Sequence, residues 1–158
     1  MIILGIDPGS NTGFGIIETD QQRIKHRAHG VIKSKHPSFN HRILSICEQI
    51  RHILEQYQPN MVAIEQSFFH KNAQSALKLG QARGAIILTV MQAHLDIHEY
   101  APRLIKSTVT GHGSADKQQV KKMISMRLNI PESKLTDDAS DALAIAMCHI
   151  QHVSIPSR

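Results

Sequence analysis

Apolar residues change their spacing along this chain after about residue 35, and the change separates two kinds of structure. Before that point they form short runs, at residues 2–6 and 13–18, which is typical of buried strands. From Phe39 to Tyr57 they recur at helical spacing instead, at Ile43, Ile46, Ile50, Ile53 and Leu54. The sequence therefore predicts a strand-rich beginning followed by alternating helices and strands.

The individual elements follow from period, capping residues and breakers. Strands at 2–7, 13–18 and 24–34, joined by short turns, form an antiparallel meander, with Gly30 as a candidate bulge. The later elements are a helix over 39–57 with Ser38 as its N-cap, a strand at 61–65, a helix over 72–93, a strand at 97–100, a helical turn from Pro102, and helices over 116–128 and 137–150. This order predicts an α/β fold with a mixed five-stranded sheet flanked by helices on both faces.

Length and composition are those of one globular domain. The chain has 158 residues, of which 41% are hydrophobic and 20% charged, so it is long enough to bury a core. We expect a single domain over residues 1–158, with a short tail after about residue 152. A formal net charge of +5 favours polyanionic partners such as nucleic acid, although many soluble proteins are as basic without binding any.

Cysteine usage and hydropathy narrow the class of protein further. Cys47 and Cys148 lie far apart in the sequence, which argues against a zinc site and a disulfide scaffold. No apolar stretch approaches the roughly 18 residues that a membrane-spanning helix requires. We therefore expect a soluble, cytoplasmic protein.

Acidic residues stand where the apolar runs end. Asp7 closes the first strand and Glu65 closes the strand at 61–65, while Asp138 and Asp141 open the last helix. A carboxylate at the end of a buried strand is unfavourable unless a cation meets it, and hard divalent ions prefer oxygen ligands. If the first strand lies beside the one at 61–65, this acidic centre in a basic protein indicates metal-assisted attack on a phosphodiester.

Each acid also has an ordinary structural explanation. Asp7 can simply cap the turn that follows it, and acids in the first turn of a helix are favoured by the helix dipole. The dipole accounts for Asp137 and Asp138 better than for Asp141, which lies beyond the first turn. Asp138 is three residues from Asp141 and Asp137 is four, so helical periodicity alone leaves both as its partner.

Four segments resemble the RuvC family, the bacterial crossover-junction endodeoxyribonucleases that resolve Holliday junctions. They are Ile-Leu-Gly-Ile-Asp-Pro-Gly-Ser at 3–10, Ala-Ile-Glu-Gln at 63–66, Lys-Asn-Ala-Gln-Ser-Ala-Leu-Lys-Leu-Gly-Gln-Ala-Arg-Gly at 71–84 and Asp-Ala-Ser-Asp-Ala-Leu-Ala-Ile-Ala at 138–146. The resemblance covers nearly the whole chain, in order and at similar spacing. It implies a ribonuclease-H-like fold and a homodimer that nicks two opposed strands of a four-way DNA junction, leaving 5′-phosphate and 3′-hydroxyl ends, in recombination and DNA repair.

The resemblance also implies roles for individual residues. It places the catalytic, metal-binding acids at Asp7, Glu65, Asp138 and Asp141, and the frame Asp-x-x-Asp-Ala-Leu-Ala selects Asp138 over Asp137. It implies two Mg²⁺ ions per active site, with Mn²⁺ as a substitute. Lys106 and Lys117 are expected near the active site and needed for activity, and the DNA-binding set is Phe68, Lys71, Lys106, Lys117 and Lys121.

A dimer interface is expected on the helix over 72–93. Small residues allow another helix to approach closely, and glycines inside a helix destabilise it by about 1 kcal/mol each, so a packed partner would explain their presence. The interface residues are Ala76, Gly80, Arg83 and Gly84. By resemblance, the branch-migration motor complex is a further partner, while the short ending after His152 leaves open any tail function of longer relatives.

Two other functions start from the same residues. Actin- and sugar-kinase-type ATPases share a phosphate loop like Gly-Ile-Asp-x-Gly-Ser, but they need two domains around the nucleotide and this chain has room for one. A catalytically silent junction-binding module is the second alternative, and the complete set of four acids argues against it.

Overall fold

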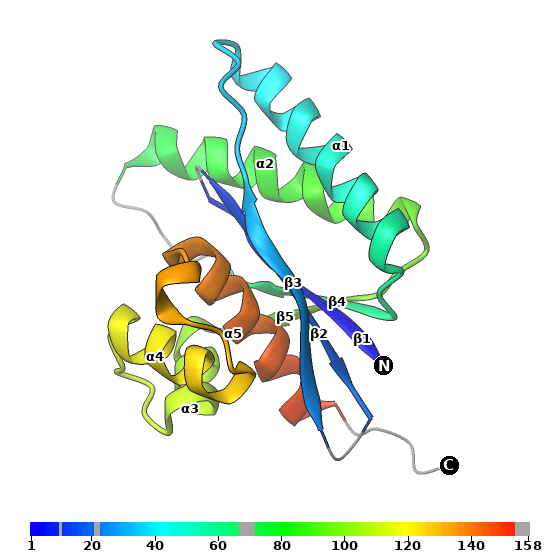
Figure 1. The fold of residues 1–158 in the computed structure, drawn as a ribbon. Helices are drawn as coiled ribbons and strands as arrows, with labels where there is room; N and C mark the ends of the chain where they lie inside the picture. Colours follow the sequence, from blue (N-terminus) through cyan, green and yellow to red (C-terminus); the bar gives the residue numbers. More distant parts are fainter. Residues whose placement is uncertain (10, 21–22, 67–71, 154–158) are drawn as a thin grey trace.

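The structure is a computed structural model that describes residues 1–9, 11–20, 23–66 and 72–153 (Figure 1). These residues form a five-stranded sheet in the order β3-β2-β1-β4-β5. Strands β1 (Ile2–Asp7), β2 (Thr12–Thr19) and β3 (Ile24–Ile32) are an antiparallel meander, whereas β4 (Met61–Glu65) and β5 (Ile97–Tyr100) continue the sheet in parallel from β1. The predicted mixed sheet is confirmed, including the pairing of the first strand with the one at 61–65.

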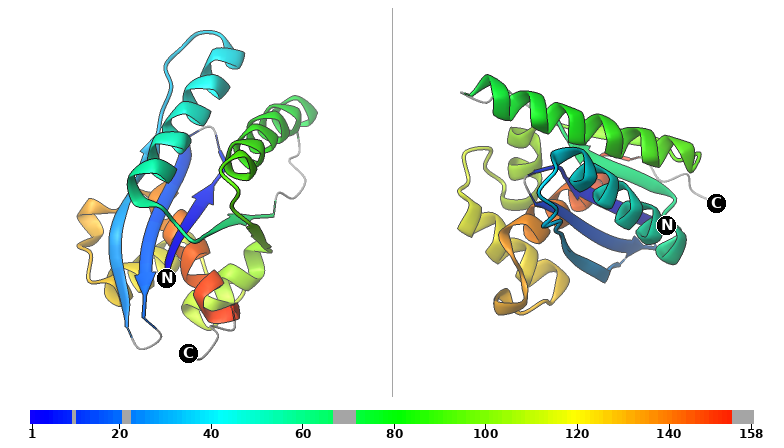
Figure 2. Two further views of the ribbon diagram at one scale, coloured as in Figure 1. Left: turned by 90° about the vertical axis from the view of Figure 1, so that its right-hand side faces the viewer. Right: turned by 90° about the horizontal axis from the view of Figure 1, so that it is seen from above.

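Helices cover both faces of this sheet (Figure 2). Helices α1 (Phe39–Tyr57) and α2 (Ala73–Gln92) pack on one face, and α3 (Pro102–Thr110), α4 (Lys117–Leu128) and α5 (Asp137–His152) on the other, with a short 3₁₀ turn at Glu132–Lys134 before α5. Within the described ranges, no helix has the combined length and apolar character that crossing a membrane requires.

Side-chain alternation along the strands divides the core in two. Ile3 and Ala63 belong to the cluster under α3, α4 and α5, whereas Leu4 belongs to the cluster under α1 and α2. Because successive strand residues point to opposite faces, Asp7 shares the face of Ile3, and Glu65 shares the face of Ala63. Both strand-end acids therefore lie on the face covered by α5.

Helix α5 packs directly against the backbone of β1 and β2. A Cβ atom added at Gly5 would overlap the carbonyl oxygen of Ala142 and lie 2.8 Å from the amide nitrogen of Ala146. A Cβ added at Gly13 would overlap the carbonyl oxygen of Asp138. These two strand positions thus require glycine because the helix backbone occupies the space that a side chain would need.

Three details differ from the predictions. Pro102 begins a nine-residue helix rather than a single turn. Gly30 is not a bulge: the register shift lies between Ile16 and Ile17, and Gly30 is instead covered by Phe14, whose Cε1 would lie 2.7 Å from an added Cβ. Ser38 does occupy the N-cap of α1, but its side chain makes no capping hydrogen bond to the described first turn.

We expect Gly5→Ala to destabilise the folded chain, because its methyl group would meet helix backbone that cannot rotate away. Overpacking of this kind lowers the free energy of unfolding by about 1–3 kcal/mol, measurable by urea denaturation. Gly80→Ala is the control, because a Cβ at this exposed helical position would meet no described atom within 4 Å and alanine favours the helix over glycine. Equal stability of Gly5→Ala and the wild type would contradict the close packing of α5.

Candidate active site

The acids at the two strand ends share one cavity with an acid from α5. The cavity has a volume of about 250 Å³, and its ionisable lining residues are Asp7, Glu65, Lys106, Lys117 and Asp141. Its apolar walls come from α3, α4 and α5, through Pro102, Ile105, Val120 and Ala144. Five of the six residues predicted to be catalytic therefore meet at one place, although they come from five different elements.

Negative charge in this cavity is poorly compensated. Burial, followed by the charges of Asp141, Glu65 and Asp138, raises the pKa of Asp7 from 3.8 to about 7, and Lys117 only partly opposes this rise. Such a shift means that the site disfavours the negative charge of an ionised Asp7, and that a bound cation would stabilise that charge.

The other two lining carboxyls are perturbed in the same direction. Burial and the charge of Asp141 raise the pKa of Glu65, while Lys106 and Lys117 lower it. Burial is also the main cause of the raised pKa of Asp141, against which the charge and hydrogen bond of Lys117 act. The two lysines thus favour the ionised carboxylates without balancing the whole group.

Lys117 is the cation in direct contact with these acids. Its Nζ lies 3.4 Å from Oδ2 of Asp141, and chiefly because of that carboxylate the pKa of Lys117 is raised. A capping box fixes the start of α4, because the Asp116 side chain accepts a hydrogen bond from the Gln119 amide while the Gln119 side chain accepts one from the Asp116 amide. The helix terminus that carries Lys117 is therefore well defined.

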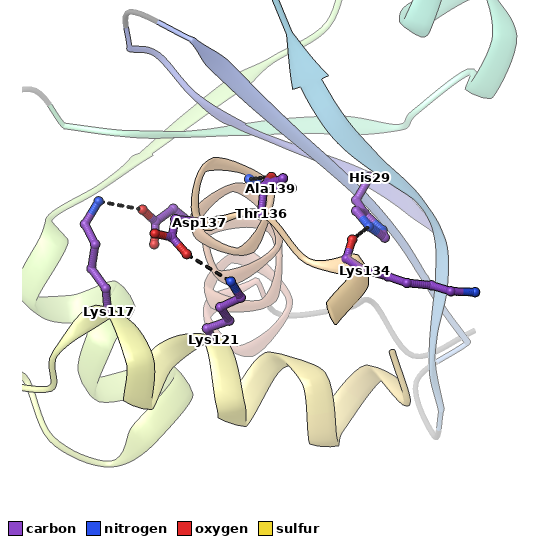
Figure 3. A network of polar contacts seen from close by, with 8 residues as sticks. His29, Lys117, Lys121, Lys134, Thr136, Asp137 and Ala139 are labelled. Atoms are coloured by element: carbon purple, nitrogen blue, oxygen red, sulfur yellow. Dashed lines mark hydrogen bonds and ion pairs between the residues drawn. The ribbon is translucent and has the colours of Figure 1, made fainter. Parts of the chain in front are cut away.

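The neighbouring acids Asp137 and Asp138 are directed differently. Nζ of Lys121 lies 3.0 Å from Oδ1 of Asp137, and Figure 3 shows this pair on the α4 side of α5. Both acids raise the pKa of Asp141, Asp137 more than Asp138, but of the two only Asp138, about 100° further around the helix, also raises the pKa of Asp7. This arrangement supports Asp138 as the acid that acts with the cavity, and it explains Asp137 as a partner of Lys121.

The chemistry of the donor set suits hard divalent cations, which prefer carboxylate oxygens. Within the described part of the chain, no three His, Cys, Asp or Glu side chains are already arranged as a finished metal site. Ion binding would therefore require the carboxylates to draw together and Asp141 to exchange its contact with Lys117 for the ion. The raised pKa values of Asp7, Glu65 and Asp141 indicate that such an ion would relieve their mutual repulsion.

The predicted DNA-binding and interface residues have mixed outcomes. Phe68 and Lys71 lie outside the described residues, so their roles stay predictions. On α2, Gly80 and Gly84 are exposed, and a Cβ at either would meet no described atom within 4 Å. Arg83, by contrast, pairs within the chain, with Nη2 2.8 Å from Oε2 of Glu99, and Ala76 is only half-buried.

An exposed apolar stripe on α2 was not predicted from the sequence. Leu77, Leu88 and Met91 have exposed fractions of 69%, 59% and 62%, and together with Gly80 and Gly84 they recur at helical spacing along one side. This side is opposite the buried face of α2. The helical spacing of these apolar residues in the sequence could have predicted the stripe.

Comparison with known proteins gives consistent matches over almost the whole chain. The family model described as "Crossover junction endodeoxyribonuclease RuvC" matches residues 3–149. The chain is 48% identical over 149 residues to the protein of that name from Vibrio campbellii, covering 94% of this chain and 86% of the relative. It is 48% identical over 157 residues to the one from Citrifermentans bemidjiense, covering 98% and 95%.

A solved structure of Thermus thermophilus RuvC in complex with Holliday junction substrate is similar to this fold. The TM-score is 0.87 at 29% sequence identity, and the match covers 95% of this chain and 93% of the other. A second T. thermophilus RuvC structure gives a TM-score of 0.84 with the same identity and coverage. The ribonuclease-H-like architecture expected from the sequence is thereby confirmed.

We expect Asp7 to make the metal-free protein less stable as the pH rises from about 4 to about 7. Its folded-state pKa of about 7 exceeds the ordinary 3.8, so the folded chain holds the proton more tightly and loses that stability on deprotonation. Asp7→Asn should therefore unfold at a higher temperature than the wild type at about pH 8 in a chelator. Glu55→Gln, at an exposed site on α1, is the control, and a wild-type melting temperature for Asp7→Asn would refute the linkage.

Proposed function

This chain belongs to the RuvC family of crossover junction endodeoxyribonucleases, and we propose that Asp7, Glu65, Asp138 and Asp141 are the acids with which it nicks DNA. It is a hydrolase of a metal-dependent nuclease family and resolves Holliday junctions in recombination and repair. The observation that carries the assignment of its site is the cavity in which acids from β1, β4 and α5 meet two lysines.

We propose that the four carboxylates hold two Mg²⁺ ions, for which Mn²⁺ can substitute. Bound ions of this kind supply Lewis acidity at the phosphate and an activated water. The carboxyl of Asp7, whose pKa is about 7 without metal, must lose its proton to act as a ligand, so metal affinity should rise with pH. Asp138 and Asp141 would both contribute their carboxylate oxygens from α5.

The two lysines have complementary tasks. Lys106 opposes the rise that burial and Asp141 cause in the pKa of Glu65, and it therefore favours the ionised carboxylate that a cation would bind. Lys117 contacts Asp141 before metal binds, and we propose that its ammonium turns to the scissile phosphate once Asp141 becomes a ligand. Water then attacks phosphorus and the 3′ oxygen departs, leaving a 5′ phosphate and a 3′ hydroxyl that ligase can join.

The two alternative functions are not supported. The family match over residues 3–149 is to crossover junction endodeoxyribonucleases, which favours nuclease chemistry over nucleotide binding. A silent binding module would have no need of acids with raised pKa values in a cavity lined by lysines.

We further propose that the enzyme acts as a homodimer that pairs through α2. The exposed stripe of Leu77, Leu88 and Met91, with Gly80 and Gly84 between them, is a surface on which a second α2 can pack closely. A two-fold dimer presents two active sites to the near two-fold symmetry of a four-way junction. The branch-migration motor complex as a partner, and a cytoplasmic location beside the DNA, are proposals that rest on the family resemblance.

Asp138 and Asp137 should differ sharply in activity. We expect Asp138→Asn to slow Mg²⁺-dependent nicking of a synthetic four-way junction at least about 100-fold, because it removes a charge that stabilises the reacting centre. Asp137→Asn should stay within about threefold of the wild type, because Asp137 pairs with Lys121, contributes a small helix-dipole effect and is not among the charges that raise the pKa of Asp7.

Junction binding measured in Ca²⁺ should survive in both variants, since affinity depends on basic residues and shape. Gel analysis of end-labelled strands should show paired nicks that ligase can seal. Equal loss of nicking in Asp137→Asn and Asp138→Asn would show that the wrong face of α5 has been assigned to the site.

Charge on the α2 stripe should dissociate the dimer. We expect Leu88→Glu to be monomeric by light scattering and to convert paired nicks into single nicks, because two carboxylates would be buried face to face. Leu44→Glu, on α1 at a similarly exposed leucine (53% exposed, against 59% for Leu88), is the matched control and should remain dimeric. A dimeric Leu88→Glu protein would place the interface elsewhere.

A further inference from the structure

A second cavity lies on the face of the sheet that α1 and α2 cover, whereas the catalytic acids lie on the face that α5 covers. It has a volume of about 510 Å³ and lies between the N-terminal halves of α1 and α2. Its lining residues are Pro8, Gly9, Phe39, Arg42, Ile46, Ser75, Lys78, Leu79 and Ala82. Nothing in the proposed chemistry uses this cavity, which is here called the α1–α2 groove.

The groove carries two positively charged side chains, and its described lining includes no acidic residue to neutralise them. The guanidinium carbon of Arg42 lies 5.5 Å from the centre of the Phe39 ring, and Nζ of Lys78 lies 5.8 Å from the same centre. No acidic residue lines the described groove, and neither α1 nor α2 carries one in its first turn. One aromatic ring thus contacts two cations, and an anion bound between them would interact favourably with both.

Arg42 also has hydrogen-bonding capacity left over. Its Nε is shielded from solvent and finds no hydrogen-bond partner among the described residues. Buried donors are normally paired, and a guanidinium forms its strongest contacts with phosphate and carboxylate oxygens. A cation–π stack that merely joins two helices would explain the ring contacts, but it would not explain the unpaired donor or the absence of an acid.

The groove adjoins the active site through the backbone. Pro8 and Gly9 line the groove, and Asp7, the residue immediately before them, lines the acidic cavity. The groove residues of α2 also lie on the side away from the exposed stripe of Leu77, Leu88 and Met91, so dimerisation through that stripe would leave the groove open. A DNA strand that passes over the C-terminal end of β1 can therefore reach both cavities.

We propose that Arg42 and Lys78, stacked on Phe39, bind the phosphodiester backbone of the junction arm that leaves the active site. This proposal rests on the function proposed above and adds a second DNA-binding surface to it. Because the groove lies outside the acidic cavity, its cations act on affinity and register, whereas Lys106 and Lys117 act on turnover.

The test compares Arg42→Ala, Lys78→Ala and the double variant with Arg51→Ala, an exposed arginine on the same helix and outside the groove. Fluorescence anisotropy gives the Kd for a four-way junction in Ca²⁺ over a range of salt concentrations. The double variant should bind about 10-fold more weakly. The slope of log Kd against log salt should fall by about 1.8, because each phosphate that a side chain no longer neutralises lowers it by about 0.9.

Single-turnover nicking at saturating enzyme should stay within about twofold of the wild type, as expected of side chains that position the DNA and do not stabilise the transition state. Arg42→Gln retains a stem that packs on Phe39 and tests the charge if the alanine variant unfolds. A Kd and salt slope equal to those of Arg51→Ala would overturn the proposal, as would slower saturating cleavage at unchanged affinity. A wild-type protein that neither binds nor cuts the junction would instead overturn the proposed function itself.

Discussion

The packing of α5 on the backbone of β1 and β2 is the constraint on which the rest of the structure depends. Gly5 and Gly13 leave no side chain in the way, so the helix lies directly on the strands and its first turns reach the end of β1. Leu143, at 0% exposure, shows how fully this helix is buried. The packing that stabilises the fold therefore also brings Asp141 beside Asp7, which no local sequence preference could do.

Hydrophobic burial stabilises this packing, whereas the repulsion between the carboxyls that it brings together destabilises it. The core holds carboxyls from three separate elements so close together that Asp7 has a pKa of about 7, and burial is the largest cause. Lys117 relieves part of this repulsion through Asp141. A divalent cation would relieve more, so metal binding and folding stability should be linked. An active site that is electrostatically incomplete in the protein alone is well suited to bind ions and a polyanionic substrate.

Much of this arrangement could be predicted because it follows from local rules. Apolar runs and helical periods located the elements, and the ends of β1 and β4 indicated where Asp7 and Glu65 would lie. The choice of Asp138 over Asp137 needed the family resemblance, since both fit helical spacing; the structure adds the Asp137–Lys121 pair. The bulge at Gly30 was wrong because a glycine covered by an aromatic ring and a glycine in a bulge look alike in sequence. The α1–α2 groove was not predicted either, because it depends on how two helices pack and has no signal within either one.

The central claim is that acids from β1, β4 and α5 act as one metal-binding unit. Anomalous diffraction from crystals soaked in Mn²⁺ tests it most directly, because manganese positions appear independently of any assumption about the site. We expect manganese in the cavity lined by Asp7, Glu65 and Asp141, with Asp138 beside it and the Lys117 ammonium displaced from Asp141. Manganese bound through Asp137, or found only outside this cavity, would contradict it.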